Sequence, residues 1–565
     1  MNDTATVTGK IAAAVENDEA LLRITDLAID YRTGHRGWTG AVRDVSLRVA
    51  PGEFVSLVGE SGSGKTTVVH GALGLLPGSA RIRAGSIAFS GVDVTGWNDQ
   101  RMALVRGNHV GFIPQDPNTS LNPAKKIGQQ VIEAVRFNER AASDAAAHQE
   151  AALESLRTAG LKDAERVFRQ YPHELSGGMK QRALIAIALA GKPKIIVADE
   201  PTSALDVTVQ KVILDHLVLL REELGIGILL VTHDLGVALD RSDRILVMRD
   251  GEIVEEGPVH HVLEHATNDY TRRLLDAAPA RHIGRLKPAS GARSVPATAL
   301  GVLEARALTK TYHLRGRGQR RELRALDAAD LVVRKGTTHA IVGESGAGKS
   351  TLASILAAFT SADGGTVRIG DRVLTGLSRG QLREIRRDLQ FVFQNPFTSL
   401  DPRFTVGKII AEPLRAFKLA TSKQEQTARV VELLKAVALD ESYLHRLPSQ
   451  LSGGQRQRVA IARALALTPE ILVLDEAVSA LDVSAQAQIL QLLVDLQAEF
   501  GLSYVFVTHD LGVVRLIAHD VTVMKDGAVV ETGSVEQVFR SPRHEYTREL
   551  LEAIPGARLA PADAR

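Results

Sequence analysis

The 565-residue sequence contains no cysteine, which excludes disulfides, thiol nucleophiles, cysteine zinc sites and cysteine-bound iron–sulfur clusters. It also has no run of 18 or more apolar residues, so no membrane-spanning helix is expected. The first 20 residues lack the basic start and the apolar stretch of a signal peptide. We therefore expect the chain to stay in the cytoplasm.

An excess of charge of one sign is lacking as well, because 68 basic residues nearly balance 66 acidic ones and leave a net charge of +2. This balance gives no electrostatic reason to expect nucleic acid as a partner. Apolar residues make up 44% of the chain and charged residues 24%, as in globular proteins. The length exceeds the size at which one hydrophobic core usually stops growing, which favours two domains.

The sequence contains two copies of one pattern. "GESGSGKT" at residues 59–66 returns as "GESGAGKS" at residues 343–350. From Ser176 and Ser452, the serines of "LSGG", to the tyrosines near the end of each half, the two copies align at an offset of 276 residues without a gap. This regularity indicates a tandem duplication, with length differences confined to the front of each half.

The duplication predicts the domain organisation. An Ala-, Pro-, Gly- and Arg-rich stretch between the halves is typical of a linker and is long enough to let the halves face one another. The predicted segments are a flexible N-terminal tail (1–20), a first domain (21–276) with a helical part (about 116–180), the linker (277–302), a second domain (303–556) with a helical part (about 395–456) and a C-terminal tail (557–565).

Each glycine-rich loop stands between an apolar strand and the start of a helix, which is the setting that a phosphate-binding loop requires. Glycines let successive backbone N–H groups approach phosphate oxygens, the lysine reaches the terminal phosphates, and the following hydroxyl is a ligand for Mg²⁺. The expected nucleotide-binding residues are Gly59, Ser61, Gly62, Gly64, Lys65, Thr66 and Thr67 in the first loop, and Gly343, Ser345, Gly346, Gly348, Lys349, Ser350 and Thr351 in the second.

Two apolar strands, "IIVADE" and "ILVLDE", each end in a pair of acids. Phosphoryl transfer depends mainly on positioning and charge compensation, so Asp199 and Asp475 are predicted to hold Mg²⁺. Glu200 and Glu476 are predicted to polarise the attacking water. The alternative is that these acids are merely solvated at the ends of strands.

A further strand in each half, "GILLVTHD" or "SYVFVTHD", ends at His233 or His509. A single histidine at a strand end is usually structural, but two in matching positions favour a catalytic role. We interpret both as residues that contact the γ-phosphate.

At "LSGGMKQR" and "LSGGQRQR" the chain resembles the ATPase cassettes of ABC transporters, from residue 21 to residue 556. The resemblance implies two tandem α/β P-loop NTPase domains, each a RecA-like core with an antiparallel β subdomain and an α-helical subdomain. It also implies that two cassettes close head to tail, so that ATP on one glycine loop is capped by the signature of the other. The signature residues are Ser176, Gly177 and Gly178, and Ser452, Gly453, Gly454 and Gln455.

Further roles are implied by the same resemblance. Tyr31 and Tyr312 match the aromatic residue that stacks on adenine, although packing within a strand is the alternative. Gln115 and Gln394 match the glutamine that joins the Mg²⁺ shell and senses the membrane partner. The loop that crosses between cassettes matches at Asp206 and Asp482.

Two composite sites follow from the head-to-tail arrangement. One would use Lys65, Glu200 and His233 with Ser452 and Gly454, and the other Lys349, Glu476 and His509 with Ser176 and Gly178. Met179 replaces the usual signature glutamine and Ala477 the proline that commonly follows the catalytic glutamate. Both departures fall on the site of Lys349. We expect both sites to hydrolyse ATP and this one to be the slower, if they differ.

The phrases "DPNTSLNP" and "NPFTSLDP", and the tails "NDYTRRLL" and "HEYTRELL", resemble the ATPase subunits of dipeptide, oligopeptide and nickel importers. The tails depart from that pattern, since Asp269 and Glu545 stand where a proline is usual. This likeness implies two integral membrane permease subunits, an extracytoplasmic solute-binding protein and a place at the cytoplasmic face of the membrane. It leaves open whether the solute is a peptide, nickel, glutathione or another small molecule.

A second class of twin-cassette ATPases acts on ribosomes, and related ATPases act in DNA repair. The ribosome-acting proteins usually join their cassettes by a long, charged, helical connector, whereas the connector here is short and Pro-rich. The repair ATPases need cysteine zinc modules, which this chain cannot form. The prediction is therefore import of a small solute, most simply di- or oligopeptides, and ribosome binding is the alternative.

Overall fold

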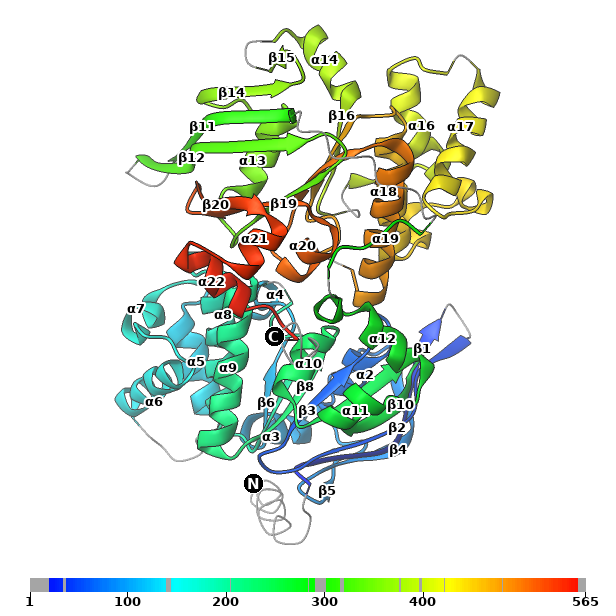
Figure 1. Cartoon of the computed structure of the whole chain (residues 1–565). Coiled ribbons are helices and arrows are strands. Elements are labelled where there is room, and N and C mark those ends of the chain that lie inside the picture. Colours follow the sequence, from blue (N-terminus) through cyan, green and yellow to red (C-terminus); the bar gives the residue numbers. More distant parts are fainter. Residues whose placement is uncertain are drawn as a thin grey trace.

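A computed structural model gives the arrangement of the chain (Figure 1). The structure describes residues 20–33, 37–138, 144–203, 205–282, 284–289, 301–315, 320–374, 377–395, 399–420, 422–479 and 481–556. Most of the two predicted tails (1–19 and 557–565) and part of the predicted linker (283 and 290–300) lie outside these residues. We call the elements from β1 to α12 the first cassette and those from β11 to α22 the second.

Each cassette contains an antiparallel sheet of four strands. Two of these strands come before the glycine loop in the chain and two come after it. In the first cassette the order is β2-β1-β4-β5, and in the second it is β12-β11-β14-β15. The strands are β1 (Leu22–Thr33), β2 (Gly37–Val49), β4 (Ala80–Phe89) and β5 (Val92–Asp93), and β11 (Gly301–Arg315), β12 (Arg320–Arg334), β14 (Gly364–Ile369) and β15 (Arg372–Val373).

A second sheet of six strands carries the glycine loop. The order is β10-β9-β3-β8-β7-β6 in the first cassette and β16-β17-β18-β13-β19-β20 in the second. Five strands run parallel in each sheet, and the edge strand β10 or β20 is antiparallel to its neighbour. The strands are β3 (Phe54–Val58), β6 (Val110–Ile113), β7 (Ile195–Asp199), β8 (Gly227–Thr232), β9 (Arg244–Arg249) and β10 (Glu252–Pro258), and β13 (Thr338–Val342), β16 (Leu389–Val392), β17 (Ile471–Asp475), β18 (Ser503–Val507), β19 (Asp520–Lys525) and β20 (Ala528–Ser534).

The helices of the two cassettes correspond in the same way. In the first they are α2 (Lys65–Ala72), α3 (Asp99–Asn108), α4 (Pro117–Ser120), α5 (Ile127–Asn138), α6 (Ala145–Thr158), α7 (Ala164–Arg169), α8 (Gly177–Leu189), α9 (Val207–Leu224), α10 (Leu235–Arg241), α11 (Val259–His265) and α12 (Asp269–Ala277). In the second they are α13 (Lys349–Leu356), α14 (Arg379–Asp388), α16 (Val406–Ala416), α17 (Lys423–Ala436), α18 (Gly453–Leu465), α19 (Val483–Phe500), α20 (Leu511–Ile517), α21 (Val535–Arg540) and α22 (Glu545–Glu552). Short 3₁₀ turns are η1 (Pro172–Glu174), η2 (Pro279–Arg281), η3 (Glu441–His445) and η4 (Pro448–Gln450).

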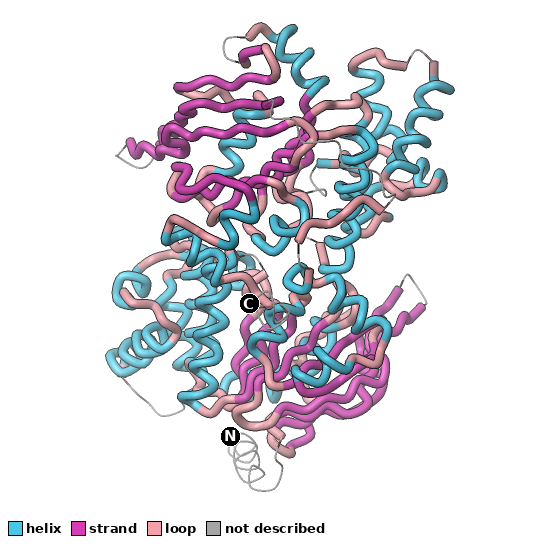
Figure 2. The backbone as a smooth tube through the Cα atoms, in the orientation of Figure 1, coloured by secondary structure: helices cyan, strands magenta, loops and turns pink. Residues whose placement is uncertain are grey.

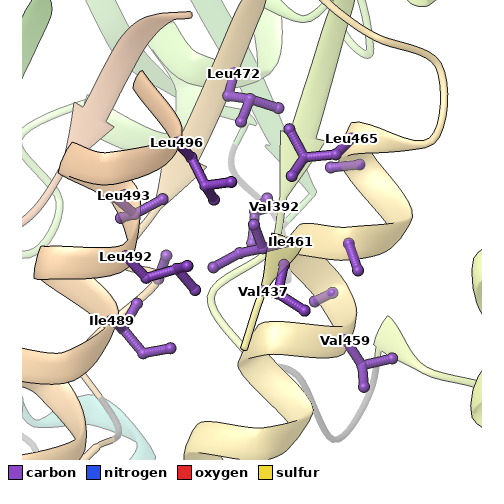
Figure 3. Packing of buried hydrophobic residues seen from close by; sticks show 14 of the residues in the cluster. Val392, Val437, Val459, Ile461, Leu465, Leu472, Ile489, Leu492, Leu493 and Leu496 are labelled. Atoms are coloured by element: carbon purple, nitrogen blue, oxygen red, sulfur yellow. The ribbon is translucent and has the colours of Figure 1, made fainter. Parts of the chain in front are cut away.

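The central parallel strands read as nearly continuous apolar runs because both of their faces are covered. All five residues of β3 and of β13 are buried. In the second cassette one face of the sheet packs on α18 and α19, where Leu472 belongs to the same buried cluster as Ile461, Leu465, Leu493 and Leu496 (Figure 3). This packing holds the carboxyl ends of the strands, and the polar residues that follow them, in fixed positions.

The cassettes are stacked head to tail. In Figure 2 the helical side of the first cassette lies below the sheets of the second, and the helical side of the second lies above the sheets of the first. Residues after α12 run along the second cassette, where the N–H of Leu286 donates to the carbonyl of Leu516 at 2.8 Å. Among the residues that the structure describes, no helix is both long enough and apolar enough to cross a membrane.

Candidate ATP sites

The two glycine loops adopt the same conformation at the carboxyl ends of β3 and β13. Gly64 and Gly348 precede the helices α2 and α13 with φ of 105° and 97°. A Cβ atom at Gly348 would lie 2.4 Å from the carbonyl oxygen of Ala325, so both the backbone angle and the space require glycine. The loops therefore present the N-terminal N–H groups of a helix to any phosphate that enters.

A buried lysine belongs to each loop. The ammonium group of Lys65 donates to the carbonyls of Gly59 and Glu60 at 2.8 and 2.9 Å. Lys349 makes the equivalent bonds at 2.7 and 2.8 Å. Burial lowers the pKa of both lysines, while the carboxylates of the strand-end acids oppose that shift. A cation held inside the loop is placed to neutralise phosphate charge.

Two of the three predicted Mg²⁺ ligands lie side by side in each cassette, while the third, Gln115 or Gln394, donates to the neighbouring glutamate. The hydroxyl of Thr66 donates to Asp199 at 3.2 Å, and that of Ser350 donates to Asp475 at 3.4 Å. Burial raises the pKa of Asp199, and it raises the pKa of Asp475 to about 6 with a further contribution from the charge of Glu476. A positive ion between these groups would restore the ionised carboxylate.

Each predicted catalytic glutamate is held by two side chains from other strand ends. Nδ1 of His233 lies 3.1 Å from Oε1 of Glu200, and Nε2 of Gln115 donates to its Oε2 at 2.9 Å. His509 and Gln394 contact the carboxylate of Glu476 in the same way, at 3.3 and 2.6 Å. The structure thus brings the sequence-predicted glutamine, glutamate and histidine together twice.

The electrostatics of these groups favour an ionised glutamate. Burial by itself would raise the pKa of Glu200, but the hydrogen bond and charge of His233, with Lys65 and Gln115, lower it below its usual value. Burial works against the imidazolium of His233, yet the partner carboxylate raises the pKa of that histidine. The same shifts occur at Glu476 and His509. A carboxylate that remains charged can accept a proton from attacking water.

Both glutamates have a left-handed backbone, with φ of 44° at Glu200 and 46° at Glu476. Such angles are costly for residues other than glycine and persist only where the surroundings impose them. Here the N–H of Glu200 donates to the carbonyl of Val231 at 2.8 Å, which ties the residue to the strand that carries the histidine. The strain is therefore stored at the predicted catalytic position of each cassette.

The predicted crossing loops behave differently in the two cassettes. Asp206 accepts from the N–H and the hydroxyl of Ser345, at 2.8 and 2.9 Å, and so contacts the glycine loop of the other cassette. Asp482 instead accepts from the N–H of Ala485 at 2.8 Å and caps its own helix α19. The crossing aspartate of the first cassette is thus hydrogen-bonded to the glycine loop of the other cassette, whereas that of the second cassette is bonded within its own.

The two signatures differ as well. Ser176 and Ser452 each accept a bond from the backbone of their own helix, α8 or α18. In the second signature Gln455 also accepts from the N–H of Ser452 at 3.0 Å and donates to Tyr443 at 3.0 Å. Met179, at the position of Gln455, has no group for either bond. Capping of ATP by these serines stays a prediction.

The tyrosines predicted to stack on adenine lie in the antiparallel sheets. Tyr31 is partly buried against the apolar core of the first cassette. Tyr312 is more open, with the ammonium group of Lys310 5.7 Å from its ring. Their role toward adenine stays a prediction.

Sequence reasoning missed one pair of residues at the glycine loops. The N–H of Glu60 donates to the hydroxyl of Tyr270 at 3.1 Å, and that of Glu344 donates to Tyr546 at 3.0 Å. Both tyrosines come from the tail phrases that served only to mark a subfamily. Their equal spacing from the histidines was the signal that could have linked them to the sites.

The predicted catalytic histidines, His233 and His509, line one cavity of about 130 Å³ where the two cassettes meet. Glu200 and Thr202 border it from the first cassette and Ser479 from the second. The two candidate catalytic centres are therefore neighbours within a single contact region.

The sequence profile of the ABC transporter family matches residues 42–203 and 326–479, once in each cassette. These matches span more than half of the chain, which therefore belongs to the ABC transporter family and is an ATPase of two fused cassettes. The predicted family, enzyme class and fold are confirmed. A second profile, described as the C-terminal region of oligopeptide/dipeptide transporters, matches residues 530–562.

Several relatives align over nearly the whole chain. It is 42% identical to the oligopeptide transport ATP-binding protein OppD of Mycobacterium tuberculosis, over 95% of this chain and 98% of that protein. It is 40% identical to the glutathione import ATP-binding protein GsiA of Salmonella typhimurium, over 95% and 90%. The peptidoglycan transport ATP-binding protein YejF of Agrobacterium fabrum is 42% identical, over 95% and 97%. A solved dimeric bacterial ABC transporter cassette matches 42% of the chain at 33% identity and a TM-score of 0.39.

Replacing each catalytic glutamate by glutamine tests the two sites. We expect Glu200→Gln to remove more than half of the ATP turnover and Glu476→Gln less than half, because the site of Glu476 carries the Met179 and Ala477 departures. The double variant should lose about 100-fold, since a positioned base contributes at least that much. The matched controls are the exposed acids of α9 and α19, Glu223→Gln and Glu499→Gln. Full activity in either single variant would show that its site is dispensable.

The absence of native cysteine allows a direct test of the seam. A chain with Asp206→Cys and Ser345→Cys should form a disulfide readily on mild oxidation, because the two side chains are in contact. The equivalent pair, Asp482→Cys with Ser61→Cys, should react more slowly, because Asp482 caps its own helix. Loss of free thiols and mobility on a non-reducing gel measure both rates. Equal rates of disulfide formation in the two pairs would contradict the inferred difference between Asp206 and Asp482.

Proposed function

We propose that this chain hydrolyses ATP to power import of di- or oligopeptides at the cytoplasmic face of a membrane. In this proposal it works with two integral permease subunits and an extracytoplasmic solute-binding protein. Support comes from the C-terminal region profile and from relatives named for oligopeptide, glutathione and peptidoglycan transport. None of these matches favours the ribosome-acting alternative.

The proposed mechanism uses two composite ATP sites. Each ATP would lie on the glycine loop of one cassette and be capped by the signature of the other. The observation that carries this proposal is the contact of Asp206 with Ser345, which places a loop of the first cassette against the glycine loop of the second. Fusion of the cassettes makes their encounter intramolecular and keeps it at a high effective concentration.

Mg²⁺ fits the residues at each loop. A hydroxyl and a buried carboxylate lie together there, and Mg²⁺ prefers such oxygen ligands combined with phosphates and water. Within the described residues no three His, Cys, Asp or Glu side chains form a metal site of their own. Binding of Mg²⁺ would therefore depend on nucleotide phosphates, with Thr66 and Asp199 or Ser350 and Asp475 supplying the protein ligands. The ion would supply charge compensation.

Hydrolysis can be linked to a membrane partner through the glutamines. Gln394 contacts Glu476 at one end, and Phe393 directly before it is 43% exposed. Phe393 stacks on Phe359, itself 48% exposed, with ring centroids 5.9 Å apart. Exposed aromatic pairs of this kind are typical anchors for a protein partner. A permease segment seated here would act on the catalytic carboxylate through one side chain.

Purification from membranes tests the proposal as a whole. The tagged chain should co-purify with two integral membrane proteins. In liposomes that contain this complex, a peptide-loaded binding protein should stimulate ATP hydrolysis and peptide uptake. The control is the same complex with Glu200→Gln and Glu476→Gln. Co-sedimentation with ribosomes, or uptake of nickel without uptake of peptide, would contradict it.

The aromatic pair gives a separate prediction. Phe393→Ala should weaken binding of the permease about tenfold, the usual cost of truncating an aromatic anchor. The control is Phe500→Ala, which removes a side chain of similar exposure (47%) at the end of α19. Affinity is measured by titrating the permease complex with labelled chain. Equal affinities of the two variants would show that the aromatic pair is not a docking site.

A further inference from the structure

The C-terminal segment of each cassette crosses to the other cassette. Helix α12 of the first cassette packs against α19 of the second, and α22 of the second packs against α9 of the first (Figure 1). Beyond these helices, Pro279 lies against Gly512 and Pro555 lies against Gly236. The two contacts are equivalent under the 276-residue offset of the duplication.

These contacts leave little room for a Cβ atom at either glycine. A Cβ atom at Gly512 would lie 3.1 Å from Cβ of Pro279, and one at Gly236 would lie 3.1 Å from backbone atoms of Pro555 and Gly556. The same atoms would lie 3.1 Å from Oδ1 of Asp510 and 3.2 Å from Oδ1 of Asp234, the residues that cap these helices. Ordinary contacts of a Cβ atom begin near 3.4 Å. Each proline segment therefore rests directly on the backbone of a helix in the other cassette.

The helices touched in this way follow the catalytic histidines. Asp234 and Asp510, the residues after His233 and His509, cap α10 and α20 by accepting from Val237 and Val513 at 3.2 Å. Gly236 and Gly512 stand in the first turn of these helices. A displacement of the first turn would shift the histidine relative to its glutamate.

The same crossing segments also contact the glycine loop of their own cassette. Tyr270 in α12 accepts from the N–H of Glu60, and Tyr546 in α22 accepts from that of Glu344. Both tyrosine rings are almost fully buried, at 4% and 2% exposed. One short helix therefore separates a contact with one glycine loop from a contact with the helix that follows the predicted catalytic histidine of the other cassette.

The connection between the cassettes does not by itself explain this geometry. Pro279 lies near the start of the predicted linker and would approach the second cassette in any case. Pro555 is not part of that connection, yet it makes the equivalent contact with Gly236, and Gly556 adds a hydrogen bond to Asp240 at 2.6 Å. The contact is thus a repeated feature of the cassette itself.

We propose that residues 270–279 and 546–555 couple the two ATP sites. In each segment the tyrosine contacts the nucleotide loop of its own cassette, and the proline positions the catalytic histidine of the other. Pro279 and Pro555 are therefore positioning residues for hydrolysis. A change at one nucleotide loop would reach the opposite histidine through a single packed helix.

A rescue experiment tests the proline contact in the full-length chain. Gly512→Ala should displace α20 and so lower kcat for ATP hydrolysis about tenfold. This loss is a part of the 10²- to 10⁴-fold rate enhancement that a positioned acid or base contributes. Pro279→Gly should also lower kcat, because it leaves a gap. The double variant should be more active than either single variant, since the alanine methyl then occupies the place of the proline ring and only its approach to Oδ1 of Asp510 remains.

The matched control combines Pro279→Gly with Gly236→Ala, which faces the other segment. Here no recovery is expected, and the two losses should multiply. Gly78→Ala, at a glycine with open space around it, should leave kcat unchanged. Thermal unfolding of every variant separates positioning from stability. The proposal is overturned if no rescue occurs, or if the losses follow the unfolding midpoint while kcat per folded chain stays constant.

A second experiment tests the link to the nucleotide loop. Tyr270→Phe removes one hydroxyl and should lower kcat. Combined with Pro279→Gly it should cause little further loss, because both residues act through the same helix. Combined with Pro555→Gly, in the other segment, the losses should multiply. Multiplicative losses in both combinations would show that tyrosine and proline act independently, and coupling through α12 would then be wrong.

Discussion

A glutamate carboxylate held between a histidine and a glutamine is the interaction that the two cassettes share at their strand ends: Glu200 lies between His233 and Gln115, and Glu476 between His509 and Gln394. Its three members come from the ends of different strands in one parallel sheet, so they meet only if the sheet has its native strand order. The strained backbone of the glutamate is tolerated because the apolar core below holds those strands. Fold stability and catalytic geometry are therefore the same requirement in this protein.

Duplication repeats that arrangement and also lets the copies differ. The second signature has a glutamine that bonds both to its own cap and to Tyr443, whereas the first has Met179. The crossing aspartates differ too, because Asp206 reaches the other cassette while Asp482 caps its own helix. Two ATP sites of one ancestry have thus acquired unequal surroundings within a single chain.

Much of the fold and of the local site geometry could be predicted because it depends on short, contiguous motifs. "GESGSGKT" needs a strand before it and a helix after it, and "IIVADE" can be buried only as a central strand. The bond from Glu60 to Tyr270 was missed, because it joins residues 210 positions apart through tertiary packing and the spacing of the tyrosines indicates a site without naming the partner. The difference between Asp206 and Asp482 was equally invisible, since both stand in the same local sequence. Domain boundaries, adenine stacking and signature capping remain predictions.

The close approach of each proline segment to a glycine of the other repeat limits how the two halves can diverge. A larger residue at position 512 fits more easily with a smaller one at position 279, although these positions descend from different parts of the ancestral cassette. Inheritance therefore links substitutions in one repeat to substitutions in its twin. Exchanging a single repeat for that of a distant homologue would break this matched pair even where every nucleotide contact was preserved.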